Sequence, residues 1–211
     1  MGDIGSEPEI VFKTYWTDDI SKPSYNNEFI IENDTLVYTN LKYVITDLKL
    51  INSKRTIFLS DYKLIDDYEK MTLDGNYSGI YQISFNFGIE NIANNYSELK
   101  SSNFDIEKGY YFMKMDFSKK NNDSIYSYNI AKKNNISKIK SFKVIIDGFN
   151  LGTGLFANEA VIGINLKNLF TKPNYINIDS LTLGSIDNKE LQLKMIENAK
   201  NIFFLEQFNY D

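Results

Sequence analysis

The sequence predicts an all-β fold: an antiparallel β-sandwich with long loop insertions and one C-terminal α-helix. Between Tyr81 and Ile89 every odd position is aromatic or aliphatic, whereas the even positions from Gln82 to Gly88 are Gln, Ser, Asn and Gly. This alternation is typical of a strand that buries one face and exposes the other, as in antiparallel sheets. Near the C-terminus apolar residues instead recur at helical spacing, at Leu191, Met195, Ala199 and Ile202.

The chain is long enough for one domain with a large core. It has 211 residues, of which 43% are hydrophobic and 15% aromatic, and no linker rich in Pro, Gly or Ser divides it. We therefore expect a single domain over residues 9–211, preceded by a flexible tail of residues 1–8.

Turn residues separate the strand-like segments of the N-terminal half. We expect strands over residues 9–16, 29–31, 36–50, 56–59, 62–65 and 71–73, before the alternating segment 79–90. Within residues 36–50 the apolar face switches at Thr46 and Asp47, which predicts a bulge or a tight bend.

Two polar stretches interrupt the second half. Residues 91–108 and 118–140 are rich in Asn, Lys and Ser, so we predict long surface loops, with one helical turn in the first. The remaining segments predict strands over 109–117, 142–146, 160–166 and 176–178, and a helical turn over 166–170 that ends before Pro173. Asp187 and Glu190 have the spacing of a capping box at the start of the final helix.

Charge and hydropathy limit the partners of the chain. The net charge is −5, the isoelectric point is about 4.9 and there is no long run of Lys or Arg, so nucleic acid is not an expected partner. No stretch is apolar enough to span a membrane, and residues 1–8 contain no apolar run of a signal peptide. We expect either a protein that stays inside the cell or one whose targeting segment is absent from this sequence.

The chain contains neither cysteine nor histidine. Ser-His-Asp and Cys-His catalytic arrangements and the usual zinc sites therefore cannot be built. Asp116 and Asp147, at the ends of predicted strands, are the candidates for an acid–base pair of carboxylates. Sequence spacing does not predict the distance between them. An acid–base enzyme is therefore kept as an alternative, and we expect that the protein is not an enzyme.

Met113 and Met115 are the candidate metal ligands. They lie on one side of the predicted strand 109–117, and their thioether sulfurs suit Cu(I). Asp147 is the candidate for an additional oxygen ligand. Tyr111 and Phe117 share the face of the methionines, so the same pattern also fits an ordinary core layer.

Two further groups of residues suggest binding sites. Asp61, Asp66, Asp67 and Glu69 are dense enough for calcium, but they lack the ordered Asp/Asn-rich loop, which favours a solvated acidic turn. Trp16 and the many tyrosines could form a platform on which sugars stack, although tyrosine is also common in strands and at core edges.

Several segments, in this order, resemble the MbnP-like copper-binding family. The matching segments are Leu41–Leu50, Leu59–Asp66, Gly79–Ile89, Gly109–Asp116, Asn165–Phe170 and Asn198–Phe203. Members of that family are exported β-sandwich proteins associated with copper handling and methanobactin operons, and many are lipoproteins. The resemblance covers most of residues 10–204, and it implies the same fold and an exported ancestry.

The departures from the family pattern fall on its copper chemistry. Ser102-Asn103-Phe104 stands where the family carries Met-x-Trp, and the segment Phe142–Gly148 lacks the family's histidine. We therefore expect a non-catalytic cell-envelope module, in the periplasm or as an outer-membrane lipoprotein, that lacks the usual copper ligands and binds a partner protein. The alternatives are a copper-binding protein that uses Met113, Met115 and Asp147, or a glycan-binding β-sandwich. The partner is expected to bind the polar stretches 91–108 and 118–140; the alternative is that these stretches are mobile tethers.

Overall fold

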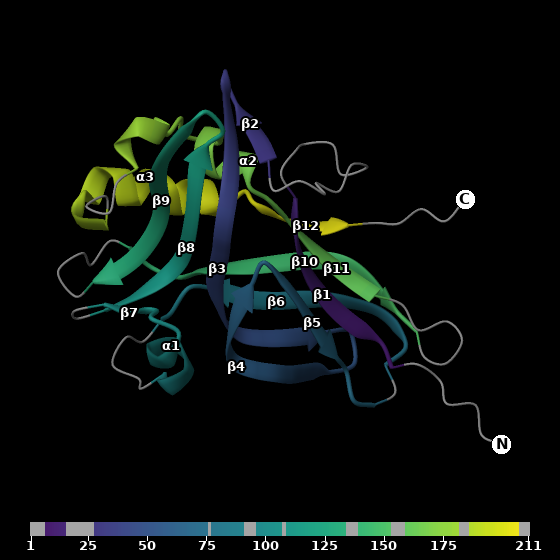
Figure 1. Cartoon of the computed structure of the whole chain (residues 1–211). Helices are drawn as coiled ribbons and strands as arrows, with labels where there is room; N and C mark the ends of the chain where they lie inside the picture. Colours follow the sequence, from purple (N-terminus) through teal and green to yellow (C-terminus); the bar gives the residue numbers. More distant parts are fainter. Residues whose placement is uncertain are drawn as a thin grey trace.

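The computed structural model describes residues 7–15, 28–75, 77–90, 96–106, 109–133, 139–152, 159–181 and 186–206. These residues form two sheets and a few short helices (Figure 1), which confirms the predicted all-β sandwich. The smaller sheet contains β1 (Glu9–Tyr15), β5 (Tyr68–Thr72), β11 (Glu159–Asn165) and β12 (Phe203–Glu206). The larger sheet contains β2 (Glu28–Ile31), β3 (Asp34–Ile51), β4 (Thr56–Asp66), β6 (Gly79–Phe87), β7 (Asp105–Ile106), β8 (Gly109–Lys119), β9 (Asn122–Lys133) and β10 (Phe142–Leu151). The helices are α1 (Ser97–Ser101), α2 (Lys167–Thr171), the 3-10 helix η1 (Ile178–Ser180) and α3 (Lys189–Ala199).

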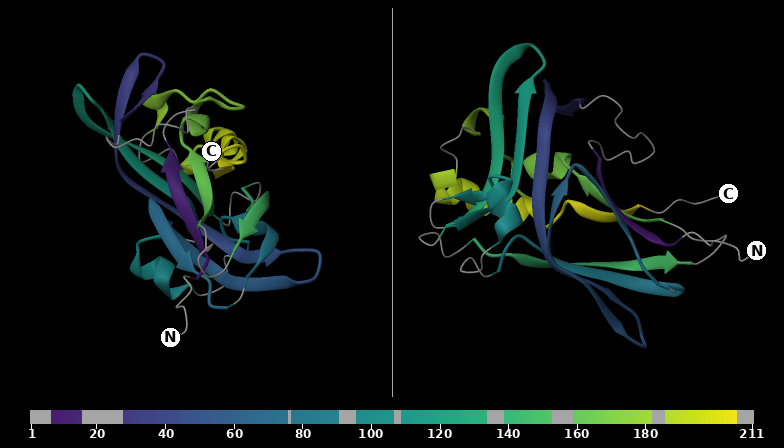
Figure 2. Two further views of the ribbon diagram at one scale, coloured as in Figure 1. Left: turned by 90° about the vertical axis from the view of Figure 1, so that its right-hand side faces the viewer. Right: turned by 60° about the horizontal axis from the view of Figure 1, so that its bottom comes forward.

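Strand β3 joins the two halves of the larger sheet. On one edge it pairs with β8 and then with β6, and on the other edge with β2 and then with β4. The predicted bulge is confirmed, because the register with β6 shifts between Thr46 and Lys49 and Asp47 has a φ of +56°. The two halves therefore diverge, and the tips of the β8–β9 and β3–β4 hairpins lie at opposite ends of the molecule (Figure 2).

Strand β6 lies at the centre of the core, as its alternation predicts. Tyr81, Ile83, Phe85 and Phe87 are all buried. Phe203 of β12 reaches this face from the smaller sheet, with ring centroids 5.2 Å from Phe85 and 5.7 Å from Phe87. These edge-to-face and tilted aromatic contacts hold the two sheets together.

The smaller sheet corrects the prediction of a wholly antiparallel fold. Strands β1 and β11 pair in parallel, with Glu9 opposite Glu159 and Tyr15 opposite Asn165. Every residue from Ala160 to Ile164 is buried, so β11 is covered on both faces like the central strands of parallel sheets. Period-two alternation reports the faces of a strand but not its direction.

Strand β9 shows that the predicted loop over residues 118–140 is wrong. Residues Asn122–Lys133 pair with almost the whole of β8. Tyr128 and Ile130 are fully buried. Ser127, one of the polar side chains that made this segment resemble a loop, donates a 2.7 Å hydrogen bond to Asp116 of β8.

The described part of residues 91–108 is also packed against the sheet rather than a plain surface loop. It contains α1 and β7, and both Leu99 and Phe104 are buried. Residues 91–95 and 107–108 lie outside the described ranges.

The remaining differences concern element boundaries. Segments 56–59 and 62–65 form one strand, β4, and residues 176–178 run into η1 instead of forming a strand. Helix α3 begins one residue later than the predicted capping box, because Asn188 is the N-cap and accepts a 3.1 Å hydrogen bond from the Leu191 N–H. The helix ends at Ala199, so Ile202 packs from the connection to β12, which the sequence pattern did not predict.

Gln192 of α3 forms hydrogen bonds with the backbone groups at the free edge of β9. Its Oε1 accepts a 3.0 Å hydrogen bond from the Ala131 N–H, and its Nε2 donates a 2.7 Å hydrogen bond to the Asn129 carbonyl. The side chain is fully buried. A glutamine therefore takes the place of a neighbouring strand where the sheet ends.

Replacing Gln192 by leucine should lower the free energy of unfolding by about 2–4 kcal/mol, because each buried backbone group left without a partner costs about 1–3 kcal/mol. Urea denaturation measures the change. The matched control is Gln82→Leu, which removes an exposed hydrogen bond to Asp147 and should change stability by less than about 0.5 kcal/mol. Equal losses in both variants would contradict the role of Gln192.

Candidate functional site

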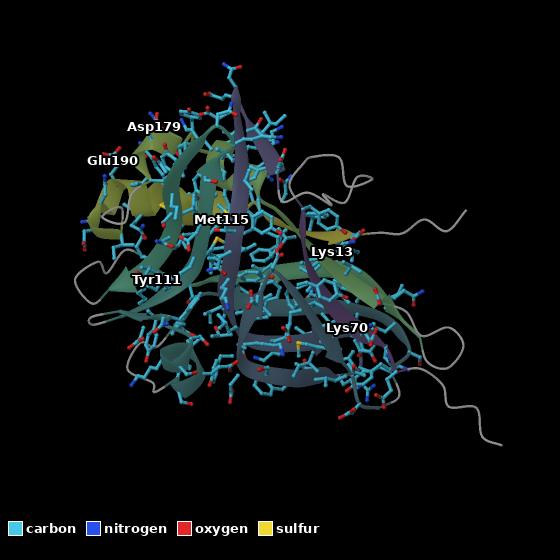
Figure 3. All side chains as sticks on the ribbon, in the orientation of Figure 1. Lys13, Lys70, Tyr111, Met115, Asp179 and Glu190 are labelled. Atoms are coloured by element: carbon cyan, nitrogen blue, oxygen red, sulfur yellow. The ribbon has the colours of Figure 1, made fainter. Side chains whose placement is uncertain are left out.

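The two candidate methionines lie in the core of the larger sheet. Met113 and Met115 are both fully buried on β8. Met113 pairs with Tyr43 and Met115 with Leu41, so each faces the interior beside a large side chain of β3. Figure 3 shows Met115 inside the molecule, between β8 and β3.

Asp147 lies far from the methionines. Its side chain is exposed on β10 and accepts a 2.5 Å hydrogen bond from Gln82. Its neighbour Ile146 is level with Leu50 of β3, because both pair with Ile83 of β6. Met113 is level with Tyr43 of β3, which lies seven positions from Leu50 along the same strand. At the rise of a strand this separation is roughly 20 Å. The three predicted ligands therefore do not fit one copper ion, and copper binding by the methionines alone stays a prediction.

The candidate carboxylates are also kept apart. Asp116 accepts its hydrogen bond from Ser127 on the β8–β9 hairpin, away from Asp147. In the acidic segment Asp66 pairs with Lys42, Glu69 pairs with Lys63, and Asp67 accepts a hydrogen bond from Tyr38. Within the described ranges, no three His, Cys, Asp or Glu side chains form a group that could hold a metal ion. The choice between a calcium site and an acidic turn stays a prediction. Trp16 lies outside the described residues, so the glycan platform stays a prediction.

A buried polar pair near the β4–β5 corner was missed by sequence reasoning. The Tyr43 hydroxyl and Asp67 Oδ1 are both buried and have no hydrogen-bond partner among the described residues. Burial, together with the charges of Asp67 and Glu69, raises the pKa of Tyr43 well above its ordinary value, so its hydroxyl stays neutral. Thr14 donates a 2.9 Å hydrogen bond to the Asp67 carbonyl and ties this corner to β1.

The asparagines of the family-like C-terminal segments have a structural role. Asn198 is fully buried in α3, and its Nδ2 donates hydrogen bonds to the carbonyls of Leu169 at 2.7 Å and Asn174 at 2.8 Å. Asn168 donates a 2.8 Å hydrogen bond to the Asn201 carbonyl. These bonds fix α2 and the following loop against α3.

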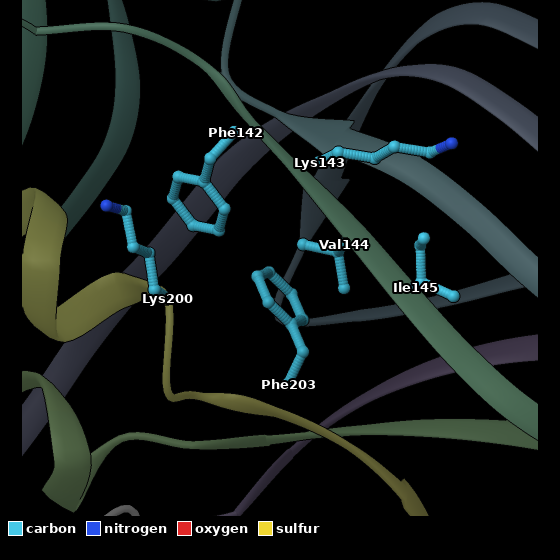
Figure 4. Close-up of a pocket in the computed structure, with 6 residues that line it drawn as sticks. All are labelled: Phe142, Lys143, Val144, Ile145, Lys200 and Phe203. Carbon is cyan, nitrogen blue, oxygen red and sulfur yellow. The ribbon is translucent and has the colours of Figure 1, made fainter.

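A pocket of about 420 Å³ lies where the two sheets meet at their edges. It is lined by Phe142, Lys143, Val144, Ile145, Lys200 and Phe203 (Figure 4). In the described structure β10 and β12 are end strands, pairing only with β6 and β11 respectively. The alternation at Phe142, Val144 and Ile146 predicted the strand, but only the position of β12 creates the pocket.

Glu206 ends β12 in a largely buried position. It accepts a hydrogen bond from the Tyr15 hydroxyl, and Lys13 Nζ lies 3.9 Å from its other oxygen. Burial raises the pKa of Glu206, and the charge of Lys13 offsets part of this effect.

The raised pKa predicts a pH-dependent contribution to stability. The unfolded chain ionises this carboxyl near its ordinary pKa of about 4.3, whereas the folded chain does so at higher pH. The stability of the wild type relative to Glu206→Gln should therefore be highest below the ordinary pKa of about 4.3. It should fall as the pH rises through the higher pKa of the folded state. Thermal denaturation of both proteins between pH 4 and pH 7 measures the difference, and parallel curves would contradict the assignment.

The two packed sheets place this chain in the class of β-sandwich proteins, and the pocket lies between their free edges. Residues 5–190 match the model of the MbnP family, and the chain belongs to this family. No curated protein and no solved structure matches the chain. None of the helices in the described ranges is long and apolar enough to cross a membrane.

Proposed function

We propose that the protein is a non-catalytic, exported accessory module of the cell envelope that binds a partner protein. The observation that carries this proposal is the pocket between the unpaired edges of β10 and β12. A pocket of this volume lies in the usual range of binding sites, about 300–1,000 Å³. Family membership supports the envelope assignment, since MbnP proteins are typically exported and associated with copper. Lipid anchoring at the outer membrane belongs to the same proposal.

The side chains available as copper ligands favour partner binding over a resident copper site. The chain has no histidine or cysteine, and the thioethers of Met113 and Met115 are enclosed by core side chains. The partner surface is assigned to β10 instead of residues 118–140, because β9 is an integral strand of the sheet.

A defined complex tests the proposal. The purified full chain, treated with a chelator, should cross-link to an envelope protein, and the purified pair should form a complex of fixed stoichiometry in analytical ultracentrifugation. Failure to form a complex with any envelope protein would contradict the proposal. A complex that requires added copper would favour the metal-dependent alternative.

The alternative function is Cu(I) binding by Met113 and Met115. It is favoured by their position on one face of β8, where two soft sulfur atoms lie two residues apart. Changing both methionines to leucine should abolish Cu(I) binding in a competition titration with bicinchoninate. The melting temperature should change little, because Met to Leu conserves volume and costs less than about 1.5 kcal/mol at each site. Unchanged copper affinity in the double variant would exclude this site.

A further inference from the structure

The first half of β10 is a sheet edge without a neighbouring strand in the described part of the chain. Its other edge pairs with β6 in regular register from Phe142 to Ile146. Beyond Ile146 the register shifts at a bulge, where Gly148 has a φ of +90° and lies close to Leu205 of β12. The pocket borders the regular part of the edge, so about five residues, or roughly 17 Å, are accessible for pairing.

A strand added along this edge would meet two different faces (Figure 4). Phe142 and Val144 lie on the side of β10 that faces Phe203, and they make this side apolar. Lys143 and Ile145 lie on the opposite side, and Ile145 is 49% exposed. Because successive side chains of a strand alternate between faces, an incoming segment would place every second side chain against the aromatic pocket. The side chains between them would lie beside Lys143.

Charge determines which segment fits this edge. Lys143 has no ion pair with any described residue, and Lys200 at the pocket pairs only with the exposed Glu197, at 2.7 Å. The stretch Phe142–Ile146 thus carries one positive charge, unpaired within the described residues, and no acidic side chain, on a chain whose net charge is −5. Lysines on edge strands discourage pairing between copies of the same protein, whereas acidic side chains complement them.

We propose that the edge of β10 from Phe142 to Ile146 binds an extended segment of a partner protein by strand addition. The segment alternates bulky apolar residues, which enter the pocket beside Phe203, with acidic residues, which pair with Lys143 on the opposite side, while Lys200 adds positive charge at the pocket. This inference rests on the proposed function and identifies both the surface and the chemistry of the partner segment.

The probe is a synthetic peptide of alternating Glu and Val with one central Phe, capped at both ends, and its counterpart with Lys in place of Glu. The full chain should bind the acidic peptide at least tenfold more tightly than the basic one in fluorescence anisotropy. The variant Lys143→Glu with Lys200→Glu should lose at least tenfold in affinity for the acidic peptide. The matched control, Lys54→Glu with Lys189→Glu, makes the same change in net charge at exposed lysines away from the pocket and should stay within twofold.

Strand addition is tested through the backbone. Two versions of the acidic peptide carry N-methyl groups on alternate amides, one on the odd and one on the even positions. One version should lose binding, since it cannot donate hydrogen bonds to β10, and the acidic peptide should slow hydrogen exchange in residues 142–146. Equal binding of both methylated peptides, or protection confined to other strands, would overturn the inference.

The partner complex separates failure of the inference from failure of the proposed function. A stable complex that leaves exchange in residues 142–146 unchanged would overturn the β10 assignment and leave partner binding intact. Absence of any complex would remove both. A small molecule or a second copy of the chain protecting the same residues, with no effect of the acidic peptide, would also overturn the proposal.

Discussion

Deleting residues 121–136 and joining the ends with a short Gly/Ser linker should abolish cooperative folding. The deletion removes β9 and with it the fully buried Tyr128 and Ile130, whose losses cost several kcal/mol each. It also removes both backbone partners of the buried Gln192 and exposes the outer edge of β8. The summed cost exceeds the typical stability of a domain, about 5–15 kcal/mol.

The control replaces only the turn at Lys120 and Asn121 with two glycines. It loses one exposed ion pair, between Lys120 and Glu28, and should retain a sharp thermal transition. Circular dichroism and tryptophan or tyrosine fluorescence follow both proteins. A sharp transition in the deletion variant would show that β9 contributes nothing essential to the core.

Replacing Gly88 by alanine should lower the free energy of unfolding by about 3–5 kcal/mol. Gly88 has a φ of +88°, which is strained for any residue with a Cβ, and strain of this kind costs about 1–3 kcal/mol. A Cβ at this position would lie 2.3 Å from the ring of Phe112, which is fully buried and cannot move aside. Overpacking of a core adds about 1–3 kcal/mol.

Gly79 provides the matched control for Gly88. Its φ is +108°, but a Cβ there would have no neighbour within 4 Å. Gly79→Ala should therefore show the backbone strain alone, about 1–3 kcal/mol. Changing Phe112 to leucine in the Gly88→Ala background should recover part of the difference. Equal losses at the two glycines would refute the contact with Phe112.

Two elements that sequence reasoning predicted, β6 and α3, have an uninterrupted hydrophobic period. The alternation around Phe85 and the helical spacing around Met195 each reflect a single face packed on the core. Strand β9 was missed because its composition is polar, although a residue such as Ser127 finds a partner in Asp116 of the neighbouring strand. Partners of this kind cannot be predicted from the neighbouring residues in the sequence.

The candidate site was harder to predict than the fold. Sequence spacing placed Met113 and Met115 on one face correctly, but it could not show that the bulge at Asp47 and the register of β6 carry Asp147 far away. The pocket depends on Phe203 of β12, which lines it together with Phe142 although the two are 61 positions apart in the sequence. Proximity of this kind arises from the packing of the two sheets and is not encoded in either segment alone.

The parallel pairing of β1 with β11 has a consequence for how the chain acquires its structure. Glu9 meets its partner Glu159 only after 150 further residues have been made, because synthesis proceeds from the N-terminus. Until then β1 can pair only with β5, through its contact with Tyr68–Thr72. Pairings between residues so distant in sequence form late and slowly. Among the described strands, β1 therefore leaves the ribosome first and completes its pairing among the last.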